Sequence, residues 1–265
     1  MSLEERVAWW VDAGTIPYNE AHNLLLHLTE QRKAEAIPDV IIVAQHPITI
    51  SFGSSKKDNQ FSGRLLEKVH SVYADASLEN VRSYLATKGV QFSDTPRGGG
   101  VTVFAPGQYM FYPIVDHRKI TGKEFDMNAY KEKIYRVLFE SLQGLGVESI
   151  QLGSQSSFET RRERRDVWTQ RNGVSLKMGS KAIHITGHIA RSGFALYVDE
   201  KGVEPFWMVN PCGHDTREVR VASVEAELKR SIPAKDVYAS VRGALQRQFG
   251  YTVLTERTRK EVGLS

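Results

Sequence analysis

The chain has 265 residues, a formal net charge of +4 and a single cysteine. A lone cysteine excludes an intrachain disulfide framework, which removes one common sign of a secreted protein. The stretch MSLEERVAWWVDAG lacks an apolar signal core, and no apolar run reaches the ~18 residues of a membrane span. We therefore expect a cytoplasmic protein that does not insert into membranes, and the positive charge favours an acidic partner.

The first predicted elements are a helix and two strands. Apolar residues recur at helical spacing in YNEAHNLLLHLTEQRK, namely Ala21, Leu24, Leu25 and Leu28, and Asn19 is the expected N-cap. The β-branched run VIIVA predicts a buried strand, and a second short strand follows Pro47 and ends at Gly53. The polar segment 54–92 contains one expected short helix, SLENVRSYLATKG.

The remaining elements alternate irregularly between strands and helices. RGGGVTVFAPGQYMFYPIVD predicts a glycine-rich loop and two strands joined by a turn, and MNAYKEKIYRVLFESLQGLG predicts a long helix closed by Gly146. KAIHITGHIA and GFALYVD read as paired strands, and SVEAELKR and DVYASVRGALQRQFG as helices. Strands outnumber those of a simple alternating pattern, so we expect an α+β (mixed α/β) fold of mixed β-sheets flanked by helices, in a single domain over residues 1–265.

The only cysteine lies in VNPCGHD, between Pro211 and Gly213. A free cysteine is most often a small buried hydrophobic residue. The flanking residues are typical of a turn, and turns at the ends of elements often carry functional side chains. A nucleophilic role for Cys212 would need a nearby group that favours the thiolate, such as a lysine, a histidine or a helix N-terminus.

Four motifs in order resemble the lipoyl(octanoyl) transferase family of the biotin/lipoate ligase-like superfamily. They are the opening helix and strand up to QHP, then RGGGVTVFAPGQYMFYPIVD, then MGSKAIHIT, and finally GFALYVD followed by FWMVNPCG. The resemblance covers nearly the whole chain. It implies the biotin/lipoate protein ligase-like catalytic fold and an acyltransferase that needs no cofactor.

By this resemblance Cys212 attacks the octanoyl thioester of acyl carrier protein and forms an S-octanoyl enzyme. The acceptor is a lysine on a lipoyl domain, either of a 2-oxoacid dehydrogenase or of the glycine cleavage H protein, and the lipoyl group is an alternative cargo. Lys181 matches the family lysine that favours the thiolate, which agrees with the effect of a nearby ammonium on a thiol pKa. Without the resemblance, Lys181 would read as a solvated surface lysine. A monomer is the expected state.

The resemblance also implies an acyl pocket, for which the alternative interpretation is a plain loop. Glycines let a backbone approach a ligand closely or present N–H groups to a thioester oxygen. The implied pocket residues are Arg97, Gly98, Gly99, Gly100, Val101, Thr102, Val103, Phe104, His184, Ile185, Thr186, Gly193, Phe194 and Ala195.

The sequence departs from the family pattern at two histidines, because Phe104 and Ser192 stand in their places. The segment from Lys181 to Gly193 is also about four residues shorter than the family pattern. His214 is a candidate replacement base. His184 and His188, if both lie on one strand, stand about 13 Å apart, so we expect no metal site.

The missing histidines leave alternatives open. One is an ATP-dependent lipoate or biotin-type protein ligase, which would not need Cys212, and another is a non-catalytic acyl-binding homologue. The run Arg161 to Arg165 reads either as a solvated surface or as a docking site for the acidic carrier protein. No recognised motif supports binding to nucleic acid.

Overall fold

A computed structural model describes residues 5–53, 60–94, 97, 100–124, 126–148, 167–172, 174–210 and 220–264. In these residues the larger sheet has eight strands in the order β10-β8-β9-β6-β2-β1-β11, with β7 paired to β8. A smaller sheet has the order β4-β3-β5. Both parallel and antiparallel pairs occur in each sheet. The expected mixed α+β fold is confirmed.

The strands of the larger sheet come from both ends of the chain and from its middle. They are β1 (Val7–Thr15), β2 (Asp39–Gln45), β6 (Gln108–Asp116), β7 (Val167–Arg171), β8 (Val174–Thr186), β9 (Ile189–Tyr197), β10 (Arg220–Val221) and β11 (Val253–Arg257). The smaller sheet consists of β3 (Thr49–Ser51), β4 (Gln91–Ser93) and β5 (Thr102–Phe104).

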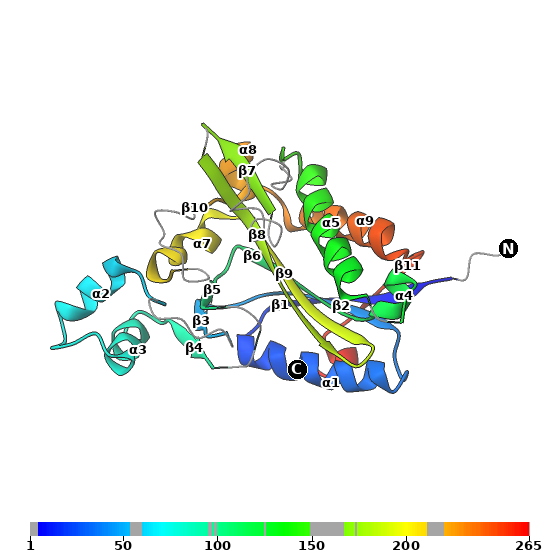
Figure 1. The fold of residues 1–265 in the computed structure, drawn as a ribbon, viewed down its shortest axis with the longest axis horizontal. Helices are drawn as coiled ribbons and strands as arrows, with labels where there is room; N and C mark the ends of the chain where they lie inside the picture. The colour runs from blue at the N-terminus through cyan, green and yellow to red at the C-terminus, as the bar shows by residue number, and fades with distance from the viewer. Residues whose placement is uncertain are drawn as a thin grey trace.

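Helices cover both faces of the larger sheet (Figure 1). The helices are α1 (Tyr18–Lys33), α2 (Gly63–His70), α3 (Leu78–Ala86), α4 (His117–Thr121), α5 (Met127–Leu145), α7 (Glu200–Val203), α8 (Val224–Leu228) and α9 (Ala234–Phe249), with the short 3-10 helices η1 (Glu204–Met208) and η3 (Lys260–Val262). The paired helices α5 and α9 lie on one face, and α1 lies on the other. Helices α2 and α3 lie with the small sheet at one end of the molecule. None of the described helices has the length and apolar character to cross a membrane.

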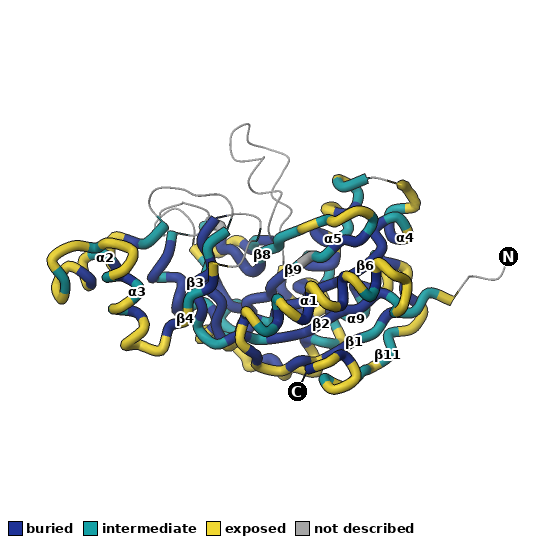
Figure 2. Tube along the Cα trace, turned by 90° about the horizontal axis from the view of Figure 1, so that it is seen from below, coloured by how far each residue is buried: buried dark blue, intermediate teal, exposed yellow. Residues whose placement is uncertain are grey.

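Two clusters of buried side chains correspond to these two faces. The first includes Phe111, Leu138, Phe194 and Val241 and joins the sheet to α5 and α9. The second includes Leu25, Tyr112, Ala195 and Val209 and joins the sheet to α1 and the small sheet. The buried stretches follow the strands through the centre of the molecule (Figure 2). We refer to these sides as the α5–α9 face and the α1 face.

The helical predictions are largely confirmed. The stripe of α1 is buried as expected, and α5 ends with Gly146 in the left-handed conformation at φ 97°. Asn19 is not the N-cap, because α1 begins at Tyr18 directly after Pro17, a residue whose fixed φ suits a helix start. Strand β1 lies before the first predicted element, and helix α2 lies within the segment that is expected to be polar. Neither element belongs to the predicted set.

The strand prediction for KAIHITGHIA is correct in type but not in extent. Strand β8 ends at Thr186 and β9 begins at Ile189, so the hairpin turn falls inside this segment at Gly187 and His188. Gly187 takes a positive φ of 61°, which a glycine adopts without strain. His184 and His188 therefore do not lie on one continuous strand.

A β-bulge in β8 reverses the direction of its side chains. Val167 pairs with Gly179 while the next residue, Trp168, pairs with Lys177, so β8 carries one extra residue there. A Cβ on Gly179 would lie 2.5 Å from the Ala195 carbonyl oxygen, so only glycine fits. Strict alternation therefore breaks at the bulge, so even-numbered residues before it and odd-numbered residues after it face the same side of the sheet.

Candidate active site

Four ring side chains form a cluster on the α1 face that we call the aromatic box: Tyr18, His46, Phe104 and Tyr112. Phe104 stacks on Tyr18 with ring centroids 4.5 Å apart, and His46 meets both rings edge-on at 5.4 Å. The family histidine is replaced by Phe104, and the structure buries that side chain to 7 % exposure. The position of the missing imidazole is thus filled by an apolar ring.

The hydrogen bonds of His46 define its tautomer. Its Nδ1 lies 2.8 Å from the Ile16 carbonyl oxygen, which can only accept, so Nδ1 carries the proton. Its Nε2 lies 2.7 Å from the Tyr112 hydroxyl and accepts from it. Burial lowers the pKa of His46 to about 4, and burial raises that of Tyr112 well above 10. Both groups are neutral at pH 7, so they orient the Tyr112 ring rather than move protons.

The Tyr112 ring lies against Gly193 of β9. A Cβ on Gly193 would stand 3.1 Å from Cε1 and 3.2 Å from Cδ1 of this ring. The absence of a side chain at Gly193 therefore leaves room for the aromatic box to approach the sheet. This contact gives the predicted pocket residue Gly193 a defined place on the α1 face.

Arg97 connects the glycine-rich loop to the small sheet. Its Nε donates to the Ser51 hydroxyl at 2.9 Å, and its Nη2 donates to the Ser51 carbonyl at 2.5 Å. Its charge also lowers the pKa of Tyr18, although burial dominates and raises that pKa overall. Arg97 thus lies close enough to the aromatic box to act on it electrostatically.

The other predicted pocket residues divide between the two faces. Gly100 is buried, and Val101, Val103, Phe104 and Ala195 belong to the core of the α1 face, with Thr102 half-buried beside them on β5. His184 and Thr186 are exposed. Ile185 and Phe194 pack instead into the core of the α5–α9 face, where Phe194 stacks on Phe111 at 5.1 Å. Gly98 and Gly99 lie outside the described residues.

Lys181 points toward the α5–α9 face. Its Nζ lies 5.2 Å from the centre of the Tyr135 ring on α5. The neighbouring Ile183 and Ile185, at the same alternation, pack against the core of that face. The structure therefore does not bring Lys181 together with the aromatic box. Its role in activating the thiol stays a prediction, because Cys212 lies outside the described residues.

Lys177 is a buried lysine that the sequence analysis did not single out. It is only 6 % exposed, and no other lysine is buried in the parts of the chain that the structure describes. Leu176 and Met178 on either side of it face α5 and α9, so Lys177 points to the α1 face. Its strand partner Val221 packs against the core of the α1 face.

A sequence signal for Lys177 did exist. It lies four residues before Lys181, and the segment from Lys181 to Gly193 falls short of the family pattern by about that length. Lysine is almost never buried without a partner, so a lysine in a β-strand with apolar neighbours on both sides is a candidate functional residue. Strict strand alternation would place Lys177 and Lys181 on the same face, but the β-bulge between them places them on opposite faces.

Cys212 lies outside the described residues, and so do His214 and the run Arg161 to Arg165. The chain on either side of the segment 211–219, which contains Cys212, is described. Asn210 donates from its side chain to the Phe61 carbonyl at 2.9 Å, and its backbone N–H donates to Gln60. After the gap, Val221 pairs with Lys177, and the Ala222 N–H donates to the Lys177 carbonyl at 2.9 Å.

Two of the sequence motifs bind each other. The Gly107 N–H of APGQ donates to Oε1 of Gln45 in QHP at 2.7 Å. The buried Gln108 side chain donates to the carbonyls of Val103 and Gly202, at 3.1 and 2.6 Å. These contacts hold the β5–β6 turn against α7, which leads through η1 to Asn210. The motifs therefore position the backbone before the cysteine.

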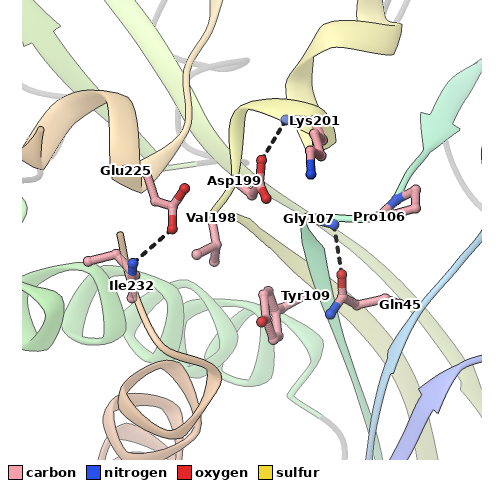
Figure 3. Close-up of a pocket in the computed structure, with 9 residues that line it drawn as sticks. All are labelled: Gln45, Pro106, Gly107, Tyr109, Val198, Asp199, Lys201, Glu225 and Ile232. Atoms are coloured by element: carbon pink, nitrogen blue, oxygen red, sulfur yellow. Dashed lines mark hydrogen bonds between the residues drawn. The ribbon is translucent and has the colours of Figure 1, made fainter. Parts of the chain in front are cut away.

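A polar cavity of about 250 Å³ lies beside this turn (Figure 3). It is lined by Gln45, Pro106, Gly107, Tyr109, Val198, Asp199, Lys201, Glu225 and Ile232. Burial, and then the charges of Asp12, Glu225 and Asp199, raise the pKa of Tyr109. Because Val198 and Ile232 belong to the core of the α5–α9 face, this cavity is distinct from the aromatic box. The charged groups of Asp199, Lys201 and Glu225 in its lining make it unfavourable for an acyl chain.

Comparison with known proteins places these features in a family context. The family model described as lipoyl protein ligase A/B catalytic domain matches residues 17–246. An octanoyltransferase of Rubrobacter xylanophilus is 30 % identical over 94 % of this chain and 98 % of its own. The mitochondrial octanoyltransferase of Arabidopsis thaliana is 28 % identical over 90 % of this chain and 87 % of its own.

Solved structures show the same fold at low sequence identity. A bipartite lipoate protein ligase of Thermoplasma acidophilum matches with a TM-score of 0.64 and 14 % identity, covering 98 % of this chain and 90 % of that one. A lipoate-protein ligase A bound with ATP matches with a TM-score of 0.66 and 14 % identity, covering 98 % and 92 %. These likenesses confirm a lipoate ligase-like fold.

Proposed function

Because the chain belongs to the family of lipoyl protein ligase A/B catalytic domains, we propose that it is an octanoyltransferase that acylates a lysine of a lipoyl domain. Its similarity to octanoyltransferases over nearly its full length supports this activity. The donor in this proposal is octanoyl-acyl carrier protein, and the intermediate is an S-octanoyl thioester on Cys212. A single domain over residues 1–265, a monomeric state and a cytoplasmic location complete the proposal.

The observation that carries the mechanism is the buried Lys177 on the α1 face. Its strand neighbour Val221 follows the segment that contains Cys212, and Asn210 precedes that segment. An ammonium beside a thiol favours the thiolate and lowers the thiol pKa. We assign to Lys177 the role that the resemblance gave to Lys181, whose Nζ lies over Tyr135 on the other face.

In the first half-reaction the Cys212 thiolate attacks the carbonyl carbon of the octanoyl thioester. A bond forms from Cys212 Sγ to this carbon, and the bond to the carrier's sulfur breaks. The departing thiolate takes a proton from the Lys177 ammonium, so the carrier leaves as a free thiol. The products are S-octanoyl enzyme, neutral Lys177 and carrier thiol.

In the second half-reaction the neutral amine of the acceptor lysine attacks the same carbonyl carbon. The new C–N bond becomes an amide as the bond to Cys212 breaks. Neutral Lys177 accepts the proton that the amine loses, which restores the thiolate and the ammonium together. The aromatic box supplies an apolar wall, and no histidine of the family pattern is needed at Phe104.

The direct test is to incubate the protein with octanoyl-acyl carrier protein in the absence of ATP and measure its intact mass. We expect a mass increase of one octanoyl group, which a lipoyl domain then removes. The Cys212→Ser variant should fold but form no octanoyl thioester. Full transfer by Cys212→Ser would contradict the covalent mechanism.

The same assay separates the alternative functions. The likeness in fold to lipoate protein ligases supports an ATP-dependent ligase as the second candidate. Such an enzyme would transfer free octanoate or lipoate only when ATP is added, and it would tolerate loss of Cys212. A non-catalytic acyl-binding homologue would transfer nothing under either condition.

A further inference from the structure

Arg191 of β9 carries a half-buried charge that has no counter-ion among the described residues. Its guanidinium forms no hydrogen bond or ion pair with any residue in the described ranges, and burial lowers its pKa below the ordinary value. A charge that is partly removed from water without a partner costs free energy. Such a site attracts an anion.

Two histidines stand beside Arg191. His184 is its cross-strand partner on β8, so both side chains project from the α1 face of the sheet. His22 lies in the second turn of α1, and α1 packs against β9. Burial lowers the pKa of His22, and the positive charges of Arg191 and His184 lower it further. We call these three residues the basic cluster.

The surroundings of the basic cluster add positive charge and no negative charge. Arg97 and Arg191 both lower the pKa of Tyr18, so the two guanidinium groups act on the same hydroxyl. No carboxylate perturbs His22 or Arg191 among the residues that the structure describes. The potential here is therefore positive at the edge of the aromatic box, where Tyr18 stacks on Phe104.

The basic cluster lies too far from Lys177 to contact an octanoyl chain. His184 is seven residues beyond Lys177 on β8, which is about 20 Å at the rise of a strand with one bulge. With carbon–carbon bonds of about 1.5 Å, an eight-carbon chain extends only about 9 Å. A pantetheine arm extends about 17 Å from sulfur to phosphorus at similar bond lengths. With the reach of Arg191 added, this arm spans the interval.

We propose that the basic cluster of His22, His184 and Arg191 binds the phosphate group of the donor's phosphopantetheine arm. The inference rests on the proposed function, because it takes a carrier thioester as the donor. The phosphodiester is the anionic group of that arm, and the forked donors of an arginine match phosphate oxygens in pairs. His184, predicted to line the acyl pocket, thereby contacts the arm and not the acyl chain.

The test compares ligands that differ only in the phosphate. Binding of phosphopantetheine and of pantetheine is measured by calorimetry with wild type, Arg191→Gln and Arg136→Gln. Arg136 forms an exposed ion pair with Glu132 on α5, and it serves as the control. We expect wild type to bind phosphopantetheine about 10- to 100-fold more tightly than pantetheine, as for one charge-assisted contact. Arg191→Gln should lose this ratio, and Arg136→Gln should keep it.

Kinetics with octanoyl-phosphopantetheine and octanoyl-pantetheine give a second readout. Arg191→Gln should lower kcat/KM for the phosphorylated donor alone, through KM, and His22→Gln should do so more weakly. An equal response to both donors would overturn the inference, and so would a loss confined to octanoyl-acyl carrier protein, which would indicate acidic side chains of the carrier. If no thioester is turned over while the phosphate ratio in binding holds, the proposed function fails and the phosphate site stands.

Discussion

On its α5–α9 face the large sheet packs Phe111 and Phe194 against two long helices, whereas on its α1 face it packs Tyr112 against Gly193 and a buried histidine. The first face is closed by apolar side chains that contact one another. The second carries the aromatic box, a buried lysine and the basic cluster. Adjacent residues of the same strand, Gly193 and Phe194, serve these different purposes because strand side chains alternate.

This difference shows that the residues of one sequence motif can lie on different faces of the sheet and serve different roles. GFALYVD resembles one continuous family motif, yet Phe194 belongs to one core and Ala195 to the other. The motif therefore combines residues that stabilise the sheet with residues that can touch a substrate. The predictions below separate these roles, beginning with the largest expected effect.

Phe194→Ala should destabilise the protein strongly while leaving the chemistry of the site intact. Phe194 is fully buried and stacks on Phe111. Removing a buried phenylalanine ring costs about 3–5 kcal/mol. Urea unfolding should show this loss, and the variant at low temperature should keep the wild-type kcat. A lowered kcat with unchanged stability would place Phe194 at the site after all.

His46→Gln should remove an acid sensitivity of the α1 face. The pKa of His46 is about 4 in the folded state and about 6.5 unfolded. The unfolded chain binds the extra proton between these values, so this stability is fully present above pH 6.5 and is lost as pH falls toward 4. The loss amounts to roughly 3 kcal/mol over that window.

The measurement is the free energy of unfolding at several pH values between 4 and 7.5. We expect a steeper decline for wild type than for His46→Gln, with the two curves converging in acid. Parallel curves would show that His46 is not held neutral by the fold.

Gly193→Ala should impair substrate use more than stability. The added Cβ would press on the Tyr112 ring, which the bond to His46 holds in place, at a cost of about 1–2 kcal/mol. We expect kcat/KM for octanoyl donors to fall about tenfold, and Tyr112→Phe in the same chain to restore part of it by releasing the ring. An unchanged kcat/KM would exclude this wall from the substrate site.

Lys181→Ala should produce the smallest effect. Its contact with the Tyr135 ring is a partly exposed cation–π interaction, worth about 0.5–1 kcal/mol. Thermal unfolding should report this small loss of stability. A double-mutant cycle with Tyr135→Leu should give an interaction free energy of the same size. Octanoyl transfer should continue at the wild-type rate.

The sequence predicted the helices and the fold class well, because apolar periodicity in segments such as Met127–Leu145 depends on local residues alone. The resemblance also placed Gly193 and Phe104 in one predicted pocket, and both lie on the α1 face. Prediction from the sequence failed where a tertiary contact decides the geometry. The bulge at Gly179 depends on a close approach of the Ala195 backbone, which no local pattern encodes, and it determines which lysine projects from the α1 face.

The most direct test of this account is the pH dependence of Cys212 alkylation by iodoacetamide in wild type, Lys177→Ala and Lys181→Ala. In the proposed mechanism the buried Lys177 of the α1 face stabilises the thiolate. Lys177→Ala should shift the alkylation profile to higher pH by about one unit or more, and Lys181→Ala should leave it at the wild-type position. A shift in Lys181→Ala with none in Lys177→Ala would contradict the assignment of the two faces.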